Sequence, residues 1–132
     1  MLAKQGYAVC AMNYAYAPRY SFPVQIRQVD EMLCYAKTFM LENYQINLEG
    51  AFLGGDSAGA NISACYATMD ANETLASQSK VKLHNSLPIQ GLLLFCGPYD
   101  FTEDLQKEEF RQLKTFLKYI GWSYLGHKSW MK

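Results

Sequence analysis

The sequence predicts an α/β protein with a parallel sheet, because buried strands alternate with helical segments along the chain. Three apolar runs are typical of strands that are covered on both faces. They span residues 7–12, 51–53 and 89–96. We therefore expect about three strands, joined by helices in right-handed crossovers. They would belong to a single partial domain that covers residues 1–132 and is truncated at both ends.

Helical patterns separate these runs. From Val24 to Met40 apolar side chains recur on one face and polar ones on the other, which predicts an amphipathic helix. Residues 60–70 are rich in small side chains and predict a helix packed close to the sheet, followed by a polar helix end and loop to His84. Thr102 is expected to cap a last helix, with a set of apolar side chains turned inward: Leu105, Leu113, Phe116, Leu117 and Ile120.

Composition excludes several classes of protein. Half of the residues are hydrophobic and 18% are charged, which is typical of a folded chain rather than a disordered one. The 12 basic residues balance the 12 acidic ones and form no cluster, so nucleic acid is not an expected partner. The chain has no apolar run of about 20 residues for a membrane span and no signal peptide, which favours the cytoplasm.

Cysteine spacing gives no sign of a metal or redox site. Cys10, Cys34, Cys65 and Cys96 form no CxxC pair, and each lies in an apolar stretch. We expect four buried, reduced thiols and no bound metal.

One short motif carries chemistry: residues 55–59, Gly-Asp-Ser-Ala-Gly, fit the pattern G-x-S-x-G. In this strand-to-helix context the pattern forms a sharp turn that presents a nucleophilic serine. Gly55 and Gly59 are expected to keep side chains out of the turn, which leaves Ser57 strained with its hydroxyl in solvent. The Ala58 N–H, at the helix start, is the expected oxyanion donor. The alternative is an ordinary glycine-rich turn.

Two stretches together resemble a known family. Residues 54–61 look like the nucleophile elbow of the α/β hydrolases, and more narrowly of the hormone-sensitive-lipase-like carboxylesterases and lipases. The run Asn13-Tyr14-Ala15-Tyr16-Ala17-Pro18, with Phe22-Pro23 and Asp30, is similar to a second signature of that branch. The resemblance covers about residues 3–100 and implies a partial α/β-hydrolase fold. Asp30 would either pin the Tyr14–Pro18 turn or lie on a solvated helix face.

The resemblance implies a serine carboxylic-ester hydrolase that works through an acyl-enzyme on Ser57, with a small-molecule ester as substrate and no cofactor. The upstream His-Gly-Gly loop of the family has no match here. The family's acid and histidine follow the serine in that order, and we expect both beyond Lys132. Asp100 and His127 have the right order, so a triad made with them is an alternative. We expect His84 to be an exposed histidine without a catalytic role.

Other functions stay open from the sequence. The motif alone does not determine which type of acyl bond is cleaved, so a thioesterase or peptidase of the same fold is one alternative. A catalytically inactive hydrolase-fold fragment, or an interaction module, is another. Homodimerisation through a free sheet edge is left open as well.

Overall fold

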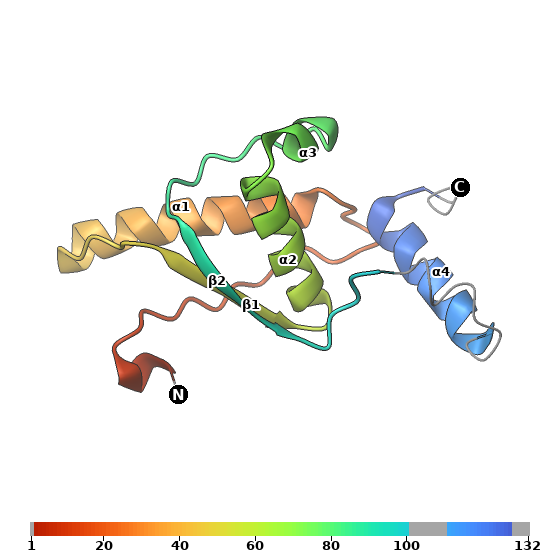
Figure 1. The fold of residues 1–132 in the computed structure, drawn as a ribbon, viewed down its shortest axis with the longest axis horizontal. Helices are drawn as coiled ribbons and strands as arrows, with labels where there is room; N and C mark the ends of the chain where they lie inside the picture. The colour runs from red at the N-terminus through yellow and green to blue at the C-terminus, as the bar shows by residue number, and fades with distance from the viewer. Residues whose placement is uncertain (1, 101–110, 128–132) are drawn as a thin grey trace.

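Residues 2–100 and 111–127 are described by a computed structural model of the chain, and they form an α/β arrangement (Figure 1). The elements in chain order are the short 3-10 helix η1 (Leu2–Gln5), α1 (Val24–Tyr44), β1 (Ala51–Asp56), α2 (Ala58–Asp70), α3 (Glu73–Gln78), β2 (Ile89–Phe95) and α4 (Arg111–Leu125). The helix expected from Val24 and the helix expected over 60–70 are both present, as α1 and α2.

The strands β1 and β2 form a parallel pair. Their register runs from Phe52 opposite Gly91 to Asp56 opposite Phe95, after an irregularity at the start of β1. The connection between them contains α2 and α3, and a parallel pair needs a crossover of this kind. The parallel α/β class predicted from the sequence is therefore confirmed.

The strand expected over residues 7–12 is not formed, and this part of the prediction is wrong. The segment runs extended below β1 (Figure 1). Residues 7–14 take part in none of the backbone-to-backbone hydrogen bonds found between described residues. A ladder needs a neighbouring strand about 4.8 Å away, whereas a cavity of about 450 Å³ separates this segment from β1. The two-stranded sheet is thus smaller than the three-stranded one expected.

The core lies between α1, α2 and one face of β1. Ile26, Val29 and Leu33 of α1 pack with Ile62 and Tyr66 of α2 in a single buried cluster. Leu53 joins the same cluster from β1, so that face of the strand is covered by the two helices. The buried face of α1 agrees only in part with the apolar stripe of the sequence: Gln25 and Asp30 are buried in it, whereas Phe39 is 37% exposed.

Glutamine side chains fix the loop that leads into α1. The Gln25 amide donates hydrogen bonds of 2.8 Å to the carbonyls of Ala15 and Tyr20. Gln28 Oε1 accepts one of 2.9 Å from the Ala15 N–H. These bonds hold the turn that the sequence assigned, as one of two options, to Asp30.

Asp30 instead joins three distant parts of the chain. Its side chain is 3% exposed and accepts hydrogen bonds from the Tyr66 hydroxyl and from the backbone N–H groups of His84 and Asn85. A buried carboxylate needs such donors because burial without them is strongly unfavourable. Both expectations for Asp30 are therefore wrong: it anchors the segment before β2.

The second face of the sheet is open within the described residues. Phe52 is 52% exposed, and Leu93 and Phe95, on the same face of the neighbouring strand, are 44% and 61% exposed. The Tyr7 ring meets the edge of Phe52 at a centroid distance of 6.4 Å. Burial of both strands on two faces, as expected from their composition, is therefore wrong for this face.

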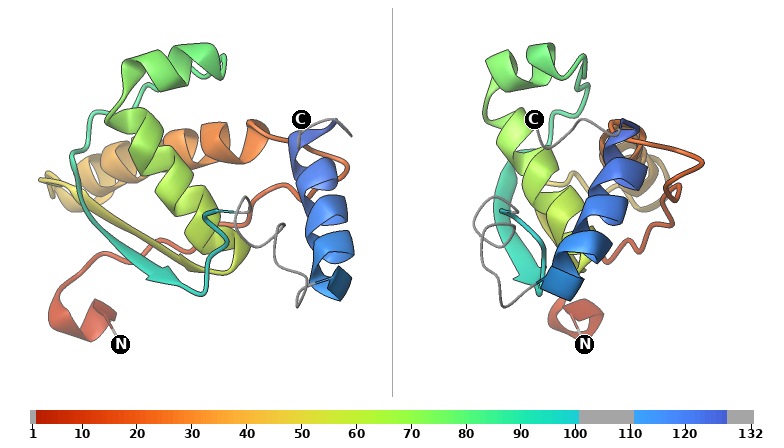
Figure 2. Two further views of the ribbon diagram at one scale, coloured as in Figure 1. Left: turned by 45° about the vertical axis from the view of Figure 1, so that its right-hand side comes forward. Right: turned by 90° about the vertical axis from the view of Figure 1, so that its right-hand side faces the viewer.

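Helix α4 lies at one end of the molecule, beside the loop that precedes α1 (Figure 2). The Phe22 N–H donates to the Tyr124 carbonyl at 2.7 Å, and the two rings pack at 5.8 Å. Phe116 and Ile120 are exposed, so their expected inward orientation is wrong, whereas Leu117 is half-buried. Thr102 and Leu105 lie outside the described residues, as does the side chain of Leu113.

The four thiols are free, but their burial differs from the expectation. Cys34 and Cys65 are half-buried, whereas Cys10 and Cys96 are exposed. Burial raises the pKa of the Cys65 thiol, so that thiol stays protonated. Among residues 2–100 and 111–127, no helix is long and apolar enough to cross a membrane. The same residues contain no group of three or more His, Cys, Asp or Glu side chains placed to hold a metal ion.

Candidate active site

Ser57 is the single residue between β1 and α2, and its backbone is strained. Its φ of 53° and ψ of −113° fall in a region that residues with a side chain rarely occupy. Two hydrogen bonds hold this conformation: the Ser57 N–H donates to the Phe95 carbonyl at 2.9 Å, and the Ser57 carbonyl accepts from the Asn61 N–H at 3.1 Å. Strain of this kind persists only where the surroundings impose it, and it gathers at functional sites.

The two motif glycines differ in what the turn requires of them. A Cβ atom on Gly55 would lie 2.5 Å from the carbonyl carbon of Gly59, so no side chain fits there without a shift of the helix. A Cβ on Gly59 would meet nothing within 4 Å. The tight turn therefore depends on the bare backbone of Gly55, whereas the surroundings of Gly59 leave room for a Cβ atom.

The N-terminus of α2 lies directly after the serine. Ala58, Gly59 and Ala60 are the first residues of the helix, and their N–H groups precede the first intrahelical hydrogen bond, which Asn61 donates to Ser57. Free amides at a helix start carry partial positive charge and suit a developing oxyanion. Ala58 is the first residue of α2, and its role as an oxyanion donor stays a prediction from the sequence.

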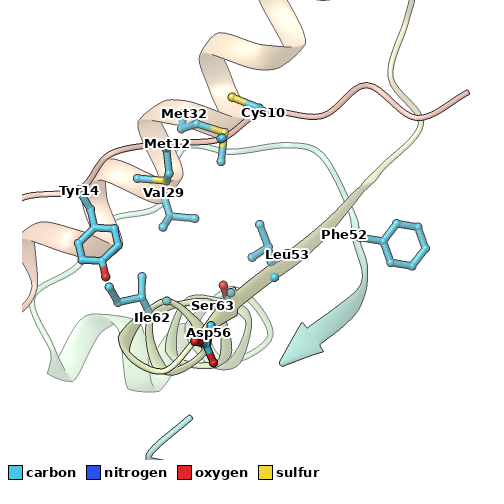
Figure 3. Close-up of a pocket in the computed structure, with 14 residues that line it drawn as sticks. Cys10, Met12, Tyr14, Val29, Met32, Phe52, Leu53, Asp56, Ile62 and Ser63 are labelled. Carbon is cyan, nitrogen blue, oxygen red and sulfur yellow. The ribbon is translucent and has the colours of Figure 1, made fainter. Parts of the chain in front are cut away.

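An apolar cavity of about 450 Å³ ends beside this turn (Figure 3). Cys10, Met12 and Tyr14 of the extended segment line it, as does Leu53 of β1. The rest of its wall comes from α1, α2 and the end of β1, through Val29, Met32, Phe52, Gly54, Gly55, Asp56, Gly59, Ile62 and Ser63. The turn thus borders a space that can take an apolar group, and Tyr14 and Met12 belong to its lining rather than to the core alone.

Among the described residues, no histidine or carboxylate is hydrogen-bonded to the Ser57 side chain. The Ser57 hydroxyl forms no hydrogen bond with either histidine in the part of the chain that the structure describes. His127 is exposed, two residues after the end of α4, and His84 is exposed and contacts Asp30 through its backbone. Asp100 is exposed in the loop after β2. No hydrogen bond between Ser57 and His127 therefore supports the alternative triad that includes Asp100.

A further hydrogen bond near the Ser57 turn was not expected from the sequence. The Asn61 amide donates a 2.6 Å hydrogen bond to the carbonyl of Pro98, in the loop after β2. Cys96, at the start of that loop, has a φ of 48°, the left-handed region that favours glycine. Asn61 lies within residues 54–61, so the motif itself indicates this residue. The motif gives no indication of the hydrogen-bond partner, which lies 37 positions away.

A serine on a strained strand-to-helix turn, at the carboxyl end of a parallel strand, has the local geometry that nucleophile elbows have in proteins of the α/β class. A family model described as alpha/beta hydrolase fold matches residues 1–126. The chain therefore belongs to the α/β-hydrolase family.

A characterised protein is similar to part of this chain. Arylacetamide deacetylase of Oryctolagus cuniculus is 38% identical over 60 residues, which are 45% of this chain and 15% of the relative. The match thus covers a small part of that protein's length. Together the two findings confirm the resemblance to hormone-sensitive-lipase-like carboxylesterases, as a partial fold.

Proposed function

We propose that this chain is the nucleophile-bearing part of a serine carboxylic-ester hydrolase, with a small-molecule ester as substrate. The observation that carries the proposal is the backbone of Ser57, held at a φ of 53° between β1 and the free amides of α2. Membership of the hydrolase family supports the reaction class. The name of the relative, a deacetylase, supports an acyl ester or amide as the kind of bond cleaved.

In this reaction Ser57 Oγ attacks the ester carbonyl while a histidine takes its proton. The Oγ–carbon bond forms, and the negative charge on the carbonyl oxygen is stabilised by the Ala58 N–H. The intermediate collapses, the alcohol leaves with the proton, and the acyl group stays on Ser57. Water then attacks the acyl-enzyme, with the histidine as base, and releases the acid. None of these steps uses a cofactor.

No base or acid of this mechanism is assigned among the described residues, because neither histidine is hydrogen-bonded to Ser57 there. An apolar acyl group would enter the cavity beside Gly55 and Gly59. A homodimer and a cytoplasmic location stay predictions from the sequence.

Labelling with a fluorophosphonate tests the nucleophile. The 132-residue chain is incubated with the probe, and intact mass and peptide mapping locate the adduct. We expect slow labelling at Ser57 and none in Ser57→Ala, since neither histidine is hydrogen-bonded to Ser57 in the described structure. Labelling of another serine at the same rate, with Ser57 unmodified, would contradict the proposal and favour an inactive hydrolase-fold module.

Substrate choice needs a second experiment. Rates of hydrolysis of a phenyl ester, its thioester and its anilide, measured on the longest natural form of the protein, would separate an esterase from a thioesterase or a peptidase. We expect the ester to be preferred.

A further inference from the structure

The cavity beside the Ser57 turn follows β1 over most of the strand. Every residue from Phe52 to Asp56 lines it, and a strand rises about 3.3 Å per residue, so the cavity extends along roughly 13 Å of β1. At one end its wall is formed by Gly55, Asp56 and Gly59, which lie on both sides of Ser57 in the sequence. The cavity thus begins at the nucleophile turn and leads away from it.

Sulfur-containing side chains form the wall that is remote from the turn. Met32 of α1 and Cys10 of the extended segment line the cavity, and Figure 3 shows both well away from Asp56. Val29 and Leu33, which flank Met32 on α1, are buried in the core, so the helix holds Met32 in place. A methionine side chain is flexible and fills irregular apolar space, which suits it to close the end of such a cavity.

Charge distinguishes the turn from the rest of the cavity. Among the described residues that line the cavity, Asp56 is the one acidic or basic side chain, and it lies at the turn. An apolar chain gains free energy for each methylene group that it buries along the remaining wall. A charged group would lose its hydration there without a partner. The cavity therefore suits an uncharged hydrocarbon chain.

We propose that this cavity holds the acyl chain of a medium-length ester, and that Met32 is a specificity-determining residue that sets the greatest length of that chain. An extended chain of roughly ten carbons matches the length of the cavity, because each carbon–carbon bond of about 1.5 Å advances a zigzag chain by slightly less than that. The proposal rests on the proposed function, which places the acyl group on Ser57. The limit on chain length is tested without catalysis.

Two exposed thiols make binding in the cavity measurable. Cys10 lines the cavity, whereas Cys96 is equally classed as exposed and does not line it. The chain is alkylated with N-ethylmaleimide in the presence of methyl ketones whose acyl parts have four, six, eight, ten or twelve carbons. A methyl ketone has the carbonyl and the chain of an ester but is not hydrolysed. Peptide mapping gives the alkylation rate at each cysteine.

The ketones should protect one thiol and not the other. At ten times its Kd, a ketone should slow alkylation of Cys10 about tenfold and leave Cys96 unchanged. Each step of two carbons should tighten binding about tenfold, and this gain should end at ten carbons. Protection of both thiols alike, or of neither, would overturn the cavity as the site of the chain. A gain that continues to twelve carbons would overturn the limit.

Two substitutions of Met32 test the limit in opposite directions. Met32→Trp fills the remote end, so the ten-carbon ketone should bind about tenfold more weakly, and Met32→Ala should let the twelve-carbon ketone gain about tenfold. The matched control is Met40→Trp, on the same helix but outside the lining of the cavity, which should bind the ketones as the wild type does. Met32→Ala decides the question if the tryptophan variant does not fold. A chain-length profile equal to that of the wild type in Met32→Ala would overturn the role of Met32.

Labelling of Ser57 by fluorophosphonates with alkyl chains of the same lengths separates this proposal from the proposed function. The labelling rate should rise with chain length and stop rising at ten carbons. A rate that is independent of chain length would overturn the link between the cavity and Ser57. Protection of Cys10 with no labelling of Ser57 by any probe would overturn the proposed function and the acyl assignment with it, whereas the chain-length limit at Met32 would stand.

Discussion

The Tyr66 hydroxyl donates a 2.9 Å hydrogen bond to the carboxylate of Asp30, and both side chains are buried. The bond joins the C-terminal half of α2 to the N-terminal third of α1. The same carboxylate accepts from the backbone of His84 and Asn85, so one side chain ties both helices to the segment that enters β2. This carboxylate is thus the acceptor of three hydrogen bonds that link parts of the core beside the Ser57 turn.

Removal of the Tyr66 hydroxyl should destabilise the chain. In Tyr66→Phe we expect the free energy of unfolding to fall by about 1–2 kcal/mol, since Asp30 loses one of its donors inside the core. Urea denaturation followed by circular dichroism measures the change. The matched control is Tyr119→Phe on the exposed face of α4, for which we expect a change near zero. An equal loss in both variants would contradict the role of the bond.

Stability should fall at alkaline pH because of two tyrosines, Tyr66 and Tyr124, whose hydroxyl groups are buried. Burial, and then the hydrogen bond to Asp30, raises the pKa of Tyr66 well above its ordinary value of 10.0, and burial does the same to the pKa of Tyr124. The folded chain therefore keeps protons that the unfolded chain loses. The free energy of unfolding should not change on account of these groups below about pH 9 and should fall as pH rises past about 10.

Urea titrations at a series of pH values measure this effect. In Tyr66→Phe the fall above pH 10 should be shallower, because one of the two groups is gone. A fall that is just as steep in that variant would show that other groups cause it.

The two motif glycines should respond differently to alanine. In Gly55→Ala the added Cβ meets the backbone of Gly59 at 2.5 Å, so we expect a loss of about 1–3 kcal/mol in the free energy of unfolding. In Gly59→Ala the Cβ has open space in a helix, and alanine favours helix, so we expect no loss or a gain of up to about 1 kcal/mol. Thermal melts of the pair compare them. Equal melting temperatures would show that the turn is looser than described.

At position 57, glycine should be better tolerated than alanine. Ser57→Gly removes the side chain from a backbone with positive φ, so this variant should be more stable than Ser57→Ala by about 1 kcal/mol. Neither variant should react with a fluorophosphonate at position 57. Urea denaturation of the two proteins makes the comparison, and a Ser57→Ala protein of equal or higher stability would contradict backbone strain at the serine.

Local patterns predicted most of the fold. The apolar stripe from Val24 gave α1, and the strand, glycine turn and small-residue helix gave β1 and α2, because each signal lies within one element. Residues 7–12 carry the same kind of pattern but form no strand. A strand is defined by its hydrogen-bonded neighbour, and that neighbour is a property of the sheet rather than of the segment.

At the candidate site, too, the local features were predicted from the sequence and the long-range contacts were not. The motif placed Ser57 at the elbow and Ala58 at the helix start. The Asn61–Pro98 bond and the partners of Asp30 could not be predicted, because they join residues 36 to 55 positions apart and depend on how α1, α2 and the loops pack. The spacing of apolar residues within one helix or strand gives no indication of such a bond. The inward face predicted for the last helix failed for a related reason, since Phe116 and Ile120 have no element packed against them in the described structure.

The uncovered face of the sheet has a consequence for how the chain behaves in concentrated solution. Leu93 and Phe95 stand in an uncharged run, residues 89–96, of the kind that stacks with copies of itself into extended assemblies. Charge repulsion keeps such surfaces apart, but the isoelectric point of this chain is about 6.7 and its formal net charge at pH 7 is zero. Near neutral pH the chain therefore has little electrostatic barrier to self-association, and its solubility should rise as the solution is made more acidic or more basic than that point.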